Sequence, residues 1–432
     1  MSSDLPSYEQ AAALVAAHAR RLARQKKPRT ERVPLGNAAN RILGAPIAAE
    51  DDQPPFARST RDGYACRAAQ ASAHKTLPIA GSTHAGQPPA GPLPPGKAWE
   101  IMTGAPVPPG ADCVVMLEHV ERSDSTIRLA PEHKINPGDN IVAKGAQARR
   151  GDEQLPPGLR LGPAQIALAA SCGYARLDVY VRPRVAILTT GDELVPLEAA
   201  PGPGKIRNSN APMLAALVAS AGAEPIVLPT AADTAEALDE ALSQALEADI
   251  LLISGGVSAG KFDLVEPALA RLGAQFHFTG VRIQPGKPLV FGEVAGSGLK
   301  PYINRPRSEE PSGPASIPIF GLPGNPISSA ATFHLFAAPI IATLAGSRET
   351  HPRFVLAQLS RDTDRKTKPG LTRFLPAFCQ FNPSISELPQ VALVPWQGSG
   401  DLTAFARSNC FLVIPEDASF LEAGTTVRIL LH

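Results

Sequence analysis

The alternation of short apolar runs and helical stretches from Val181 onward limits the choice of fold more than any other feature of this chain. Buried strands are predicted at 185–188, 226–228 and 250–253, and near Leu289 and Ile319. Helices are predicted at 213–220, through Leu238, Leu242 and Leu246, near 264–272, and from about 326 to 344. This order predicts a mostly parallel, doubly wound sheet with helices on both faces.

The remainder of the chain lacks this alternation and is predicted to form three further units. Its 45 prolines are roughly twice the usual share of about 5%. Proline removes a ladder donor, so this pattern favours turns and short strands. The predicted division is an N-terminal helix and linker segment at 1–56, joined in space by 152–180; a small β domain at 57–151; the α/β domain at 181–345; and a C-terminal β-barrel-like domain at 350–432.

The first helix is predicted from its start signal and its apolar face. Ser7 and Gln10 are spaced as a capping box. The residues that follow on one helical face are Leu14, Val15, His18 and Leu22.

Charge and cysteine content exclude several function classes. Lys+Arg number 41 and Asp+Glu 40, so we expect neither nucleic acid nor an anionic membrane as a partner. The five cysteines form no C-x-x-C pair, which favours buried free thiols in a reducing compartment. We find no signal pattern and no apolar run near 18 residues, and we expect a cytoplasmic protein. His119 and His277 lie among apolar residues and are interpreted as packed side chains.

Three glycine-bearing loops follow three of the predicted strands, at 189–194, 255–260 and 321–326. Ligands bind at the carboxyl ends of the strands in an open parallel sheet, and glycines let backbone N–H groups approach a phosphate. The loops therefore predict a phosphate-bearing or nucleotide-like ligand. The residues expected to bind it are Thr190, Gly191, Gly255, Gly256, Ser258, Gly260, Pro323, Gly324 and Asn325.

Acidic and basic residues near these loops indicate a metal-assisted reaction. Glu193 and Asp263 would repel a phosphate unless Mg²⁺ lay between them. Lys287, in the rigid turn 284–288, can bind a small oxyanion. For Asp233, capping of the next helix together with Glu236 is an equal alternative. The motifs H-E-x-x-H and G-x-x-x-x-G-K-[ST] are absent.

Taken together, the motifs resemble those of the MoeA-type molybdopterin molybdenumtransferases and the matching gephyrin domain. The resemblance covers nearly the whole chain in order. The matching strings are S-T-R-D-G-Y-A at 59–65, I-M-T-G-A-P-V-P-P-G-A-D at 101–112, G-D-E-L at 191–194, N-S-N at 208–210, G-G-V-S at 255–258, P-G-K-P at 285–288, G-L-P-G-N-P at 321–326 and G-S-G at 398–400.

The resemblance implies an elongated homodimer, with an active site between the α/β domain of one subunit and the β domain of the other. It implies insertion of molybdenum from molybdate into adenylylated molybdopterin, with AMP released and Mg²⁺ required. The upstream adenylyltransferase and recipient molybdoenzymes are further implied partners. By position, the catalytic residues are Asp62, Glu193, Asp233 and Asp263; the metal ligands are Glu193, Asp263 and Asp62; Asn210 joins the cofactor-binding set; and the molybdate pocket is Lys287, Ser328, Arg373 and Ser399.

Two departures from the family pattern leave alternatives open. Arg61 replaces a methionine before the Asp-Gly-Tyr turn, and Ala146-Gln147 replaces a Glu-Asp pair. An amide cannot supply the lost charge at a metal, although Asp139 and Asp152 are near in sequence. A non-catalytic molybdopterin-binding or cofactor-delivery scaffold is therefore one alternative. Adenylyl transfer onto molybdopterin is another, because the α/β domain resembles that of the adenylyltransferase.

Overall fold

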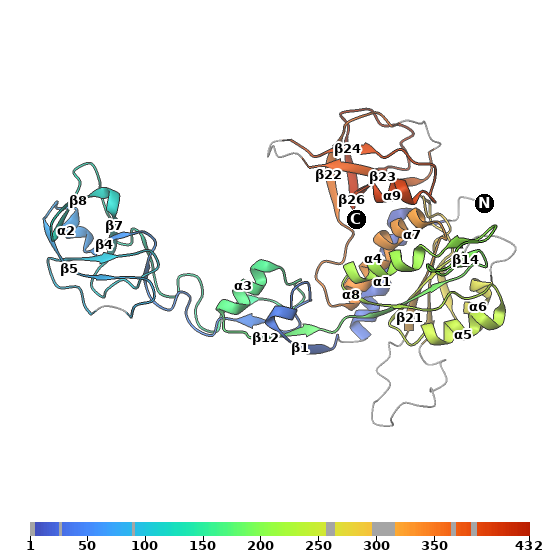
Figure 1. Cartoon of the computed structure of the whole chain (residues 1–432), viewed down its shortest axis with the longest axis horizontal. Helices are drawn as coiled ribbons and strands as arrows, with labels where there is room; N and C mark the ends of the chain where they lie inside the picture. Colours follow the sequence, from blue (N-terminus) through green and yellow to red (C-terminus); the bar gives the residue numbers. More distant parts are fainter. Residues whose placement is uncertain are drawn as a thin grey trace, which may run out of the picture.

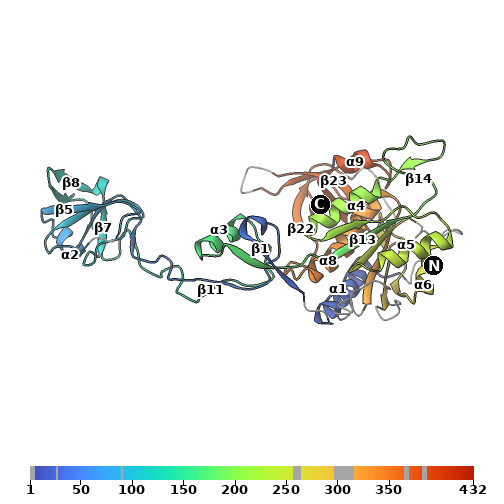
Figure 2. The same cartoon turned by 60° about the horizontal axis from the view of Figure 1, so that its bottom comes forward.

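The computed structural model describes residues 5–25, 28–88, 91–255, 264–295, 316–363, 369–381 and 387–432. The molecule is elongated, with a small β domain at one end and the α/β domain and C-terminal barrel together at the other (Figures 1 and 2). Two stretches of chain, one outgoing and one returning, connect the ends. This arrangement confirms the predicted fold class.

The α/β domain contains a six-stranded sheet in the order β16-β13-β17-β21-β20-β18. The first four strands are parallel, and β20 and β18 are antiparallel to their neighbours. The strands are β13 (Arg184–Thr189), β16 (Glu224–Val227), β17 (Ile250–Ser254), β18 (Gln275–Phe278), β20 (Val290–Ala295) and β21 (Ser316–Leu322). A two-residue parallel pair, β14 (Leu194–Val195) and β15 (Ile206–Arg207), lies outside this sheet.

Helices cover both faces of this sheet, which is why its strands are apolar runs without alternation. Val185 and Ile187 of β13 belong to one core cluster, whereas Ala186 and Leu188 belong to the other. The first cluster includes residues of α4 (Asn210–Ser220), α7 (Pro326–Thr332), the π-helical turn η4 (Phe333–Ala337) and α8 (Ala338–Leu344). The second includes α5 (Ala235–Ala245) and α6 (Val265–Arg271).

Helix α1 (Tyr8–Gln25) packs on this domain and contacts α8, although the sequence placed it with the linker segment. The predicted capping box is confirmed, because Ser7 N donates to Gln10 Oε1 at 2.9 Å and Gln10 N donates to Ser7 Oγ at 3.3 Å. Val15, His18 and Leu22 are buried as expected. Leu14 is 47% exposed, so its assignment to the buried face was wrong.

Two antiparallel strand pairs form the connection to the small domain. β1 (Thr30–Pro34) pairs with β12 (Arg176–Tyr180), and β2 (Ile47–Ala48) pairs with β11 (Glu153–Leu155). The 3-10 turn η1 (Leu35–Asn37) and helix α3 (Pro163–Ser171) complete this segment. Residues 30–48 and 153–180 thus lie together in space.

The small β domain has a six-stranded sheet in the order β7-β4-β6-β5-β9-β8. Its core includes Tyr64, Cys66 and Cys113, and all five cysteines of the chain are buried free thiols as predicted. Its elements are β3 (Arg58–Ser59), β4 (Gly63–Cys66), α2 (Ala68–Ala71), β5 (Leu77–Thr83), β6 (Ala98–Ile101), β7 (Cys113–Met116), η2 (Leu117–His119), β8 (Val120–Ser123), β9 (Thr126–Leu129) and β10 (Ile141–Val142).

The C-terminal strands form a closed barrel. The order β23-β24-β22-β26-β25 is completed by pairing of β25 with β23, and β19 (Ile283–Gln284) adds to β23 from the α/β domain. The sequence did not identify β23 or β25 as strands. The elements are β22 (Phe354–Leu359), β23 (Thr372–Gln380), β24 (Gln390–Leu393), α9 (Leu402–Ala406), β25 (Cys410–Ile414) and β26 (Thr426–Leu431).

One helical stretch of the described chain, Pro326–Leu344, is long and apolar enough to cross a membrane by length and composition. The search for uninterrupted apolar runs missed it because Ser328, Ser329 and His334 divide the run. In the structure 67% of its most apolar window is buried, and Ile327, Phe336 and others belong to the α/β core. The stretch therefore serves as a core helix of this domain.

Candidate active site

The strand order brings the starts of the three glycine-bearing loops together. β13, β17 and β21 are parallel neighbours, with Thr189 opposite Ser254 and Ser254 opposite Leu322. The three loops therefore leave one edge of the sheet, as predicted. The N–H of Thr190 donates to the carbonyl oxygen of Ser254 at 3.1 Å, which joins the first loop to the second.

Gly255 permits the closest approach between these loops. Its φ is +96°, and a Cβ there would lie 2.3 Å from the carbonyl oxygen of Thr190. A Cβ on Gly324 would lie 3.7 Å from the Cα of Gly255, so the third loop is in contact as well. A side chain at position 255 would force the first two loops apart.

Asn210, at the start of α4, connects the second loop to the third. Its Nδ2 donates to Ser254 Oγ at 2.9 Å and to Gly324 O at 2.6 Å. Its Oδ1, like Thr190 Oγ1, is buried with no hydrogen-bond partner among the residues the structure describes. Buried polar atoms are normally paired, so these two oxygens are suited to bind a polar ligand at this edge.

Three carboxylates lie beside the first loop. Asp192 N and Asp233 Oδ2 are 3.4 Å apart, and Asp233 N and Asp192 Oδ1 are 3.3 Å apart. Glu193 folds back so that its Oε2 would be 2.6 Å from a Cβ on Gly191. Partial desolvation and the charges of Asp192 and Glu193 raise the pKa of Asp233. Because Mg²⁺ prefers carboxylate oxygens, this excess of negative charge fits a divalent cation.

The helix-capping interpretation of Asp233 with Glu236 is wrong. Thr234 is the N-cap of α5, and its hydroxyl accepts a hydrogen bond from Ala237 N at 3.3 Å. The Asp233 carboxylate therefore remains available at the strand edge. Four further predicted site residues, Gly256, Ser258, Gly260 and Asp263, lie outside the described part of the chain.

Of the four predicted oxyanion residues, Ser328 lies on helix α7, and Lys287 and Ser399 lie in segments that contact this helix. Arg373 is 3% exposed, burial lowers its pKa, and its Nε donates to Gln284 Oε1 at 3.2 Å beside the turn that carries Lys287. In that turn Gly286 has a φ of +107°, and a Cβ there would lie 2.5 Å from Thr332 Cγ2 of α7. The turn containing Lys287 is therefore pressed against the helix.

The barrel reaches the other end of α7 through Ser399. Asn325 Nδ2 donates to Ser399 Oγ at 2.9 Å, and Ile327 N donates to Ser399 O at 3.0 Å. Ser328, the next residue of the helix, is 4% exposed. These contacts explain how residues from two domains, far apart in sequence, come to border one helix.

Asp62 lies elsewhere, in the small β domain. Thr103 donates to its Oδ1 from the backbone N at 2.6 Å and from Oγ1 at 2.8 Å, and these two bonds lower the pKa of Asp62. Strand β4, which begins at Gly63, is at the opposite end of the molecule from α4 (Figure 1). A single chain therefore does not bring Asp62 to Glu193.

Comparison with known proteins gives matches along almost the whole chain. Three family descriptions match: "MoeA N-terminal region (domain I and II)" at 6–173, "Probable molybdopterin binding domain" at 186–343 and "MoeA C-terminal region (domain IV)" at 358–432. A molybdopterin molybdenumtransferase from Nostoc sp. is 35% identical over 413 residues, covering 93% of this chain and 88% of that protein. The chain belongs to the molybdopterin molybdenumtransferase family.

Two further relatives show the extent of the likeness. The molybdopterin molybdenumtransferase of Bacillus subtilis is 33% identical, covering 94% of this chain and 91% of that protein. The crystal structure of a molybdopterin biosynthesis moeA protein from Pyrococcus horikoshii OT3 is 29% identical, with a TM-score of 0.77 and coverage of 99% and 100% of the two chains. The family fold is thus present from end to end.

Sequence reasoning missed several polar residues of this molybdenumtransferase fold. Asp192 faces Asp233, Gln284 contacts Arg373, and Ser254 Oγ lies 3.4 Å from Ser329 Oγ. Ser254 and Ser329 had a usable signal, since each lies in or directly beside one of the three loops. Gln284 had none, because its partner Arg373 is on a strand that the sequence did not predict.

The segment with the altered Glu-Asp pair lies next to another carboxylate. Asp52 Oδ2 is 3.7 Å from Lys144 Nζ, and its Cγ would be 3.5 Å from a Cβ on Gly145. The N–H of Arg150 donates to Asp52 Oδ1 at 3.0 Å, and this bond lowers the pKa of Asp52. Asp52 was not considered from the sequence because it is about 95 positions before Ala146-Gln147.

Proposed function

We propose that this chain inserts molybdenum from molybdate into adenylylated molybdopterin and releases AMP in a Mg²⁺-dependent reaction. The observation that carries the proposal is the shared strand edge, where three loops, Asn210 and three carboxylates meet. The loops suit a phosphate-bearing substrate, and Thr190 and Asn210 offer it buried oxygens that have no partner within the described part of the chain.

Asp192, Glu193 and Asp233 are the residues we propose to hold Mg²⁺. When bound, the ion would stabilise the negative charge that develops around phosphorus during cleavage. Lys287 is exposed at its turn and supplies a positive charge for the molybdate oxyanion. Arg373 positions the same turn through Gln284, and Ser399 positions the start of α7 through Asn325.

We further propose a cytoplasmic homodimer in which Asp62 of one subunit completes the site of the other. This arrangement is supported by the distance between the two domains within one chain (Figures 1 and 2). The partners implied by the reaction are an adenylyltransferase, which supplies the substrate, and molybdoenzymes, which receive the product.

The test is a single-turnover assay of purified full-length protein with adenylylated molybdopterin, molybdate and Mg²⁺. We expect AMP release, which Lys287→Ala reduces by at least about 100-fold through loss of electrostatic stabilisation. Lys75→Ala, an exposed lysine of the small β domain, is the matched control and should retain full activity. Absence of AMP release from the unaltered chain would refute the proposal.

A non-catalytic scaffold remains the second candidate, because Ala146 and Gln147 replace two carboxylates. Gln147 is exposed, so Gln147→Asp can be made without disturbing a core. A large gain in AMP release would favour the scaffold for the natural chain. Equal activity would favour the transferase, with Asp52, which lies against Gly145, as the carboxylate to examine by Asp52→Asn.

A further inference from the structure

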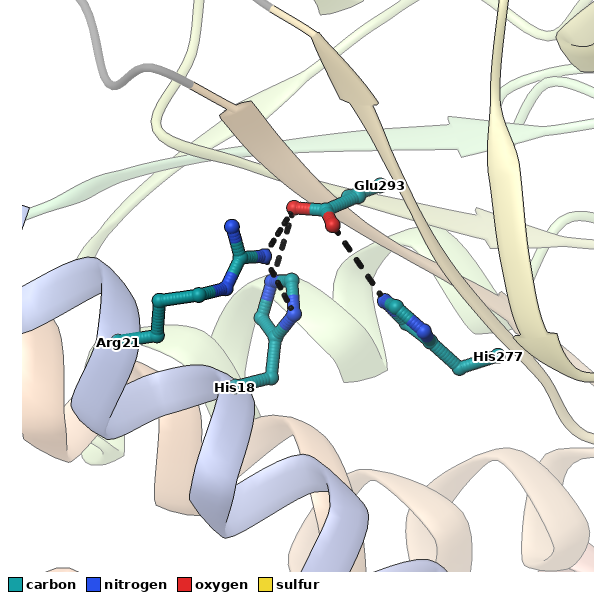
Figure 3. Close-up of polar contacts among 4 residues, drawn as sticks. All are labelled: His18, Arg21, His277 and Glu293. Atoms are coloured by element: carbon teal, nitrogen blue, oxygen red, sulfur yellow. Dashed lines mark hydrogen bonds and ion pairs between the residues drawn. The ribbon is translucent and has the colours of Figure 1, made fainter.

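A second cluster of titratable side chains lies apart from the strand edge described above. His18 comes from α1, His277 from β18 and Glu293 from β20, and their polar ends converge between the helix and the sheet (Figure 3). Glu293 is opposite Pro318, near the beginning of β21, whereas the candidate active site follows the end of that strand. The cluster is therefore separate from the proposed reaction.

The spacing of the three side chains suits a tetrahedral metal ion. His18 Nε2 is 3.5 Å from Glu293 Oε2, and His277 Nε2 is 3.6 Å from Glu293 Oε1. One ligand atom from each residue lies within 4.8 Å of the others. Zinc bonds of about 2.0–2.1 Å at tetrahedral angles place ligand atoms roughly 3.3–3.4 Å apart. Small side-chain rotations would therefore satisfy the geometry.

His18 is the most buried of the three side chains. It is 6% exposed, and its Nε2 is buried without a hydrogen-bond partner among the described residues. It packs edge-on to Phe291, with ring centroids 5.2 Å apart, which fixes the ring.

Arg21 is the competing cation. Its Nη2 lies 2.5 Å from Glu293 Oε2 and 3.0 Å from His18 Nδ1. Its side chain is 44% exposed, whereas that of Glu293 is 12% exposed. Arg21 can therefore turn into solvent while Glu293 stays in place, and the carboxylate can exchange one positive partner for another.

We propose that His18, His277 and Glu293 bind one zinc ion, which displaces Arg21 from Glu293. Two imidazoles and one carboxylate form a nitrogen and oxygen ligand set that zinc accepts, with a fourth position left for water. The interpretation of His277 as a packed side chain was wrong, because its side chain is 31% exposed, which provides access from solvent. Bound zinc would fasten α1 to β18 and β20.

The first test is titration of chelator-treated, full-length protein with Zn²⁺ by calorimetry and with Co²⁺ by visible absorption. We expect one ion per chain, tetrahedral Co²⁺ bands and a raised melting temperature. His277→Ala and Glu293→Gln should each weaken binding by at least about 100-fold. His133→Ala, which removes a histidine stacked on His119, is the control and should bind normally. The proposal would be overturned if the unaltered chain did not bind the metal, or if binding survived both ligand substitutions.

The second test uses Arg21→Gln, which leaves all three ligands in place. Removal of the competing charge should tighten Zn²⁺ binding roughly tenfold. An ion-pair cluster without a metal role would show no such gain, so unchanged or weaker binding would count against zinc. Circular dichroism of each variant in metal-free buffer checks the fold. AMP release should be unaffected in all of them, which separates this proposal from the proposed reaction.

Discussion

At the scale of single residues, Asp233 carries the same charge as the two acidic residues of the loop that it faces. Partial desolvation raises its pKa, and the charges of Asp192 and Glu193 raise it further. A carboxyl group with a raised folded pKa stabilises the fold at low pH, and this contribution is lost as pH rises through the folded pKa.

Asp233→Asn should therefore stabilise the metal-free protein at pH 7. Because the side chain is exposed, we expect a rise in melting temperature of less than about 2 °C. The difference should shrink as the pH falls below the normal aspartate range and as Mg²⁺ is added. Calorimetric scans at several pH values measure the difference in melting temperature. A lower melting temperature for the variant at pH 7 would contradict repulsion between these carboxylates.

Gly255→Ala should disrupt the loops directly. A methyl group would meet the Thr190 carbonyl, and the positive φ adds strain, so we expect a loss of about 1–3 kcal/mol in unfolding free energy and reduced AMP release. Gly202→Ala is the matched control, since a Cβ there has no neighbour within 4 Å. Urea denaturation distinguishes the two, and equal stability would mean that the loops relax at little cost.

Several individual residues could be predicted from sequence because local chemistry determined them. The capping box of Ser7 and Gln10 is one case, since both partners are three positions apart. The exposure of Leu14 and the pairing of Asp192 with Asp233 depend on packing between distant segments, which local spacing does not encode.

At the scale of elements, α5 shows how one residue defines a helix start. Thr234→Ala removes the hydroxyl that accepts from Ala237 N and should lower the unfolding free energy by about 1 kcal/mol. Thr234→Ser keeps the cap and should change it little. Denaturation curves of the two variants provide the measurement. An equal loss in both would assign the effect to the Thr234 methyl group instead.

The α/β elements were predictable because their apolar runs are continuous and separated by clear helices. The barrel strands were harder to predict. β23 contains Pro376 and charged Arg373, and its burial depends on pairing with β24 and β25. Closure of the sheet determines the strand order in the barrel. The residue pattern of a single strand gives no information about closure.

At the scale of the whole molecule, a composite site between subunits makes a distinctive prediction. Asp62→Ala and Lys287→Ala homodimers should each be inactive. Mixed and reassembled at equal amounts, they should recover about a quarter of normal AMP release, because half the dimers carry one intact site of two. Sedimentation measures the dimer. Mixtures as inactive as their parents would refute a site shared between subunits.

The elongated shape of the molecule was expected from the family resemblance alone. Neither composition nor periodicity gives the distance between domains. The four-unit division also remains a prediction, with α1 observed on the α/β core. Chain order did not reveal this placement because α1 and α8 are separated by the linker and the small domain.

The contact of α1 with α8 has a consequence for how the protein is made. Tyr8–Gln25 is synthesised before Ala338–Leu344, which completes its packing surface. At a translation rate of roughly 5–20 residues per second, the apolar face of this helix stays exposed for on the order of 15–60 s. Folding of this core around α1 therefore follows synthesis of almost the whole α/β domain.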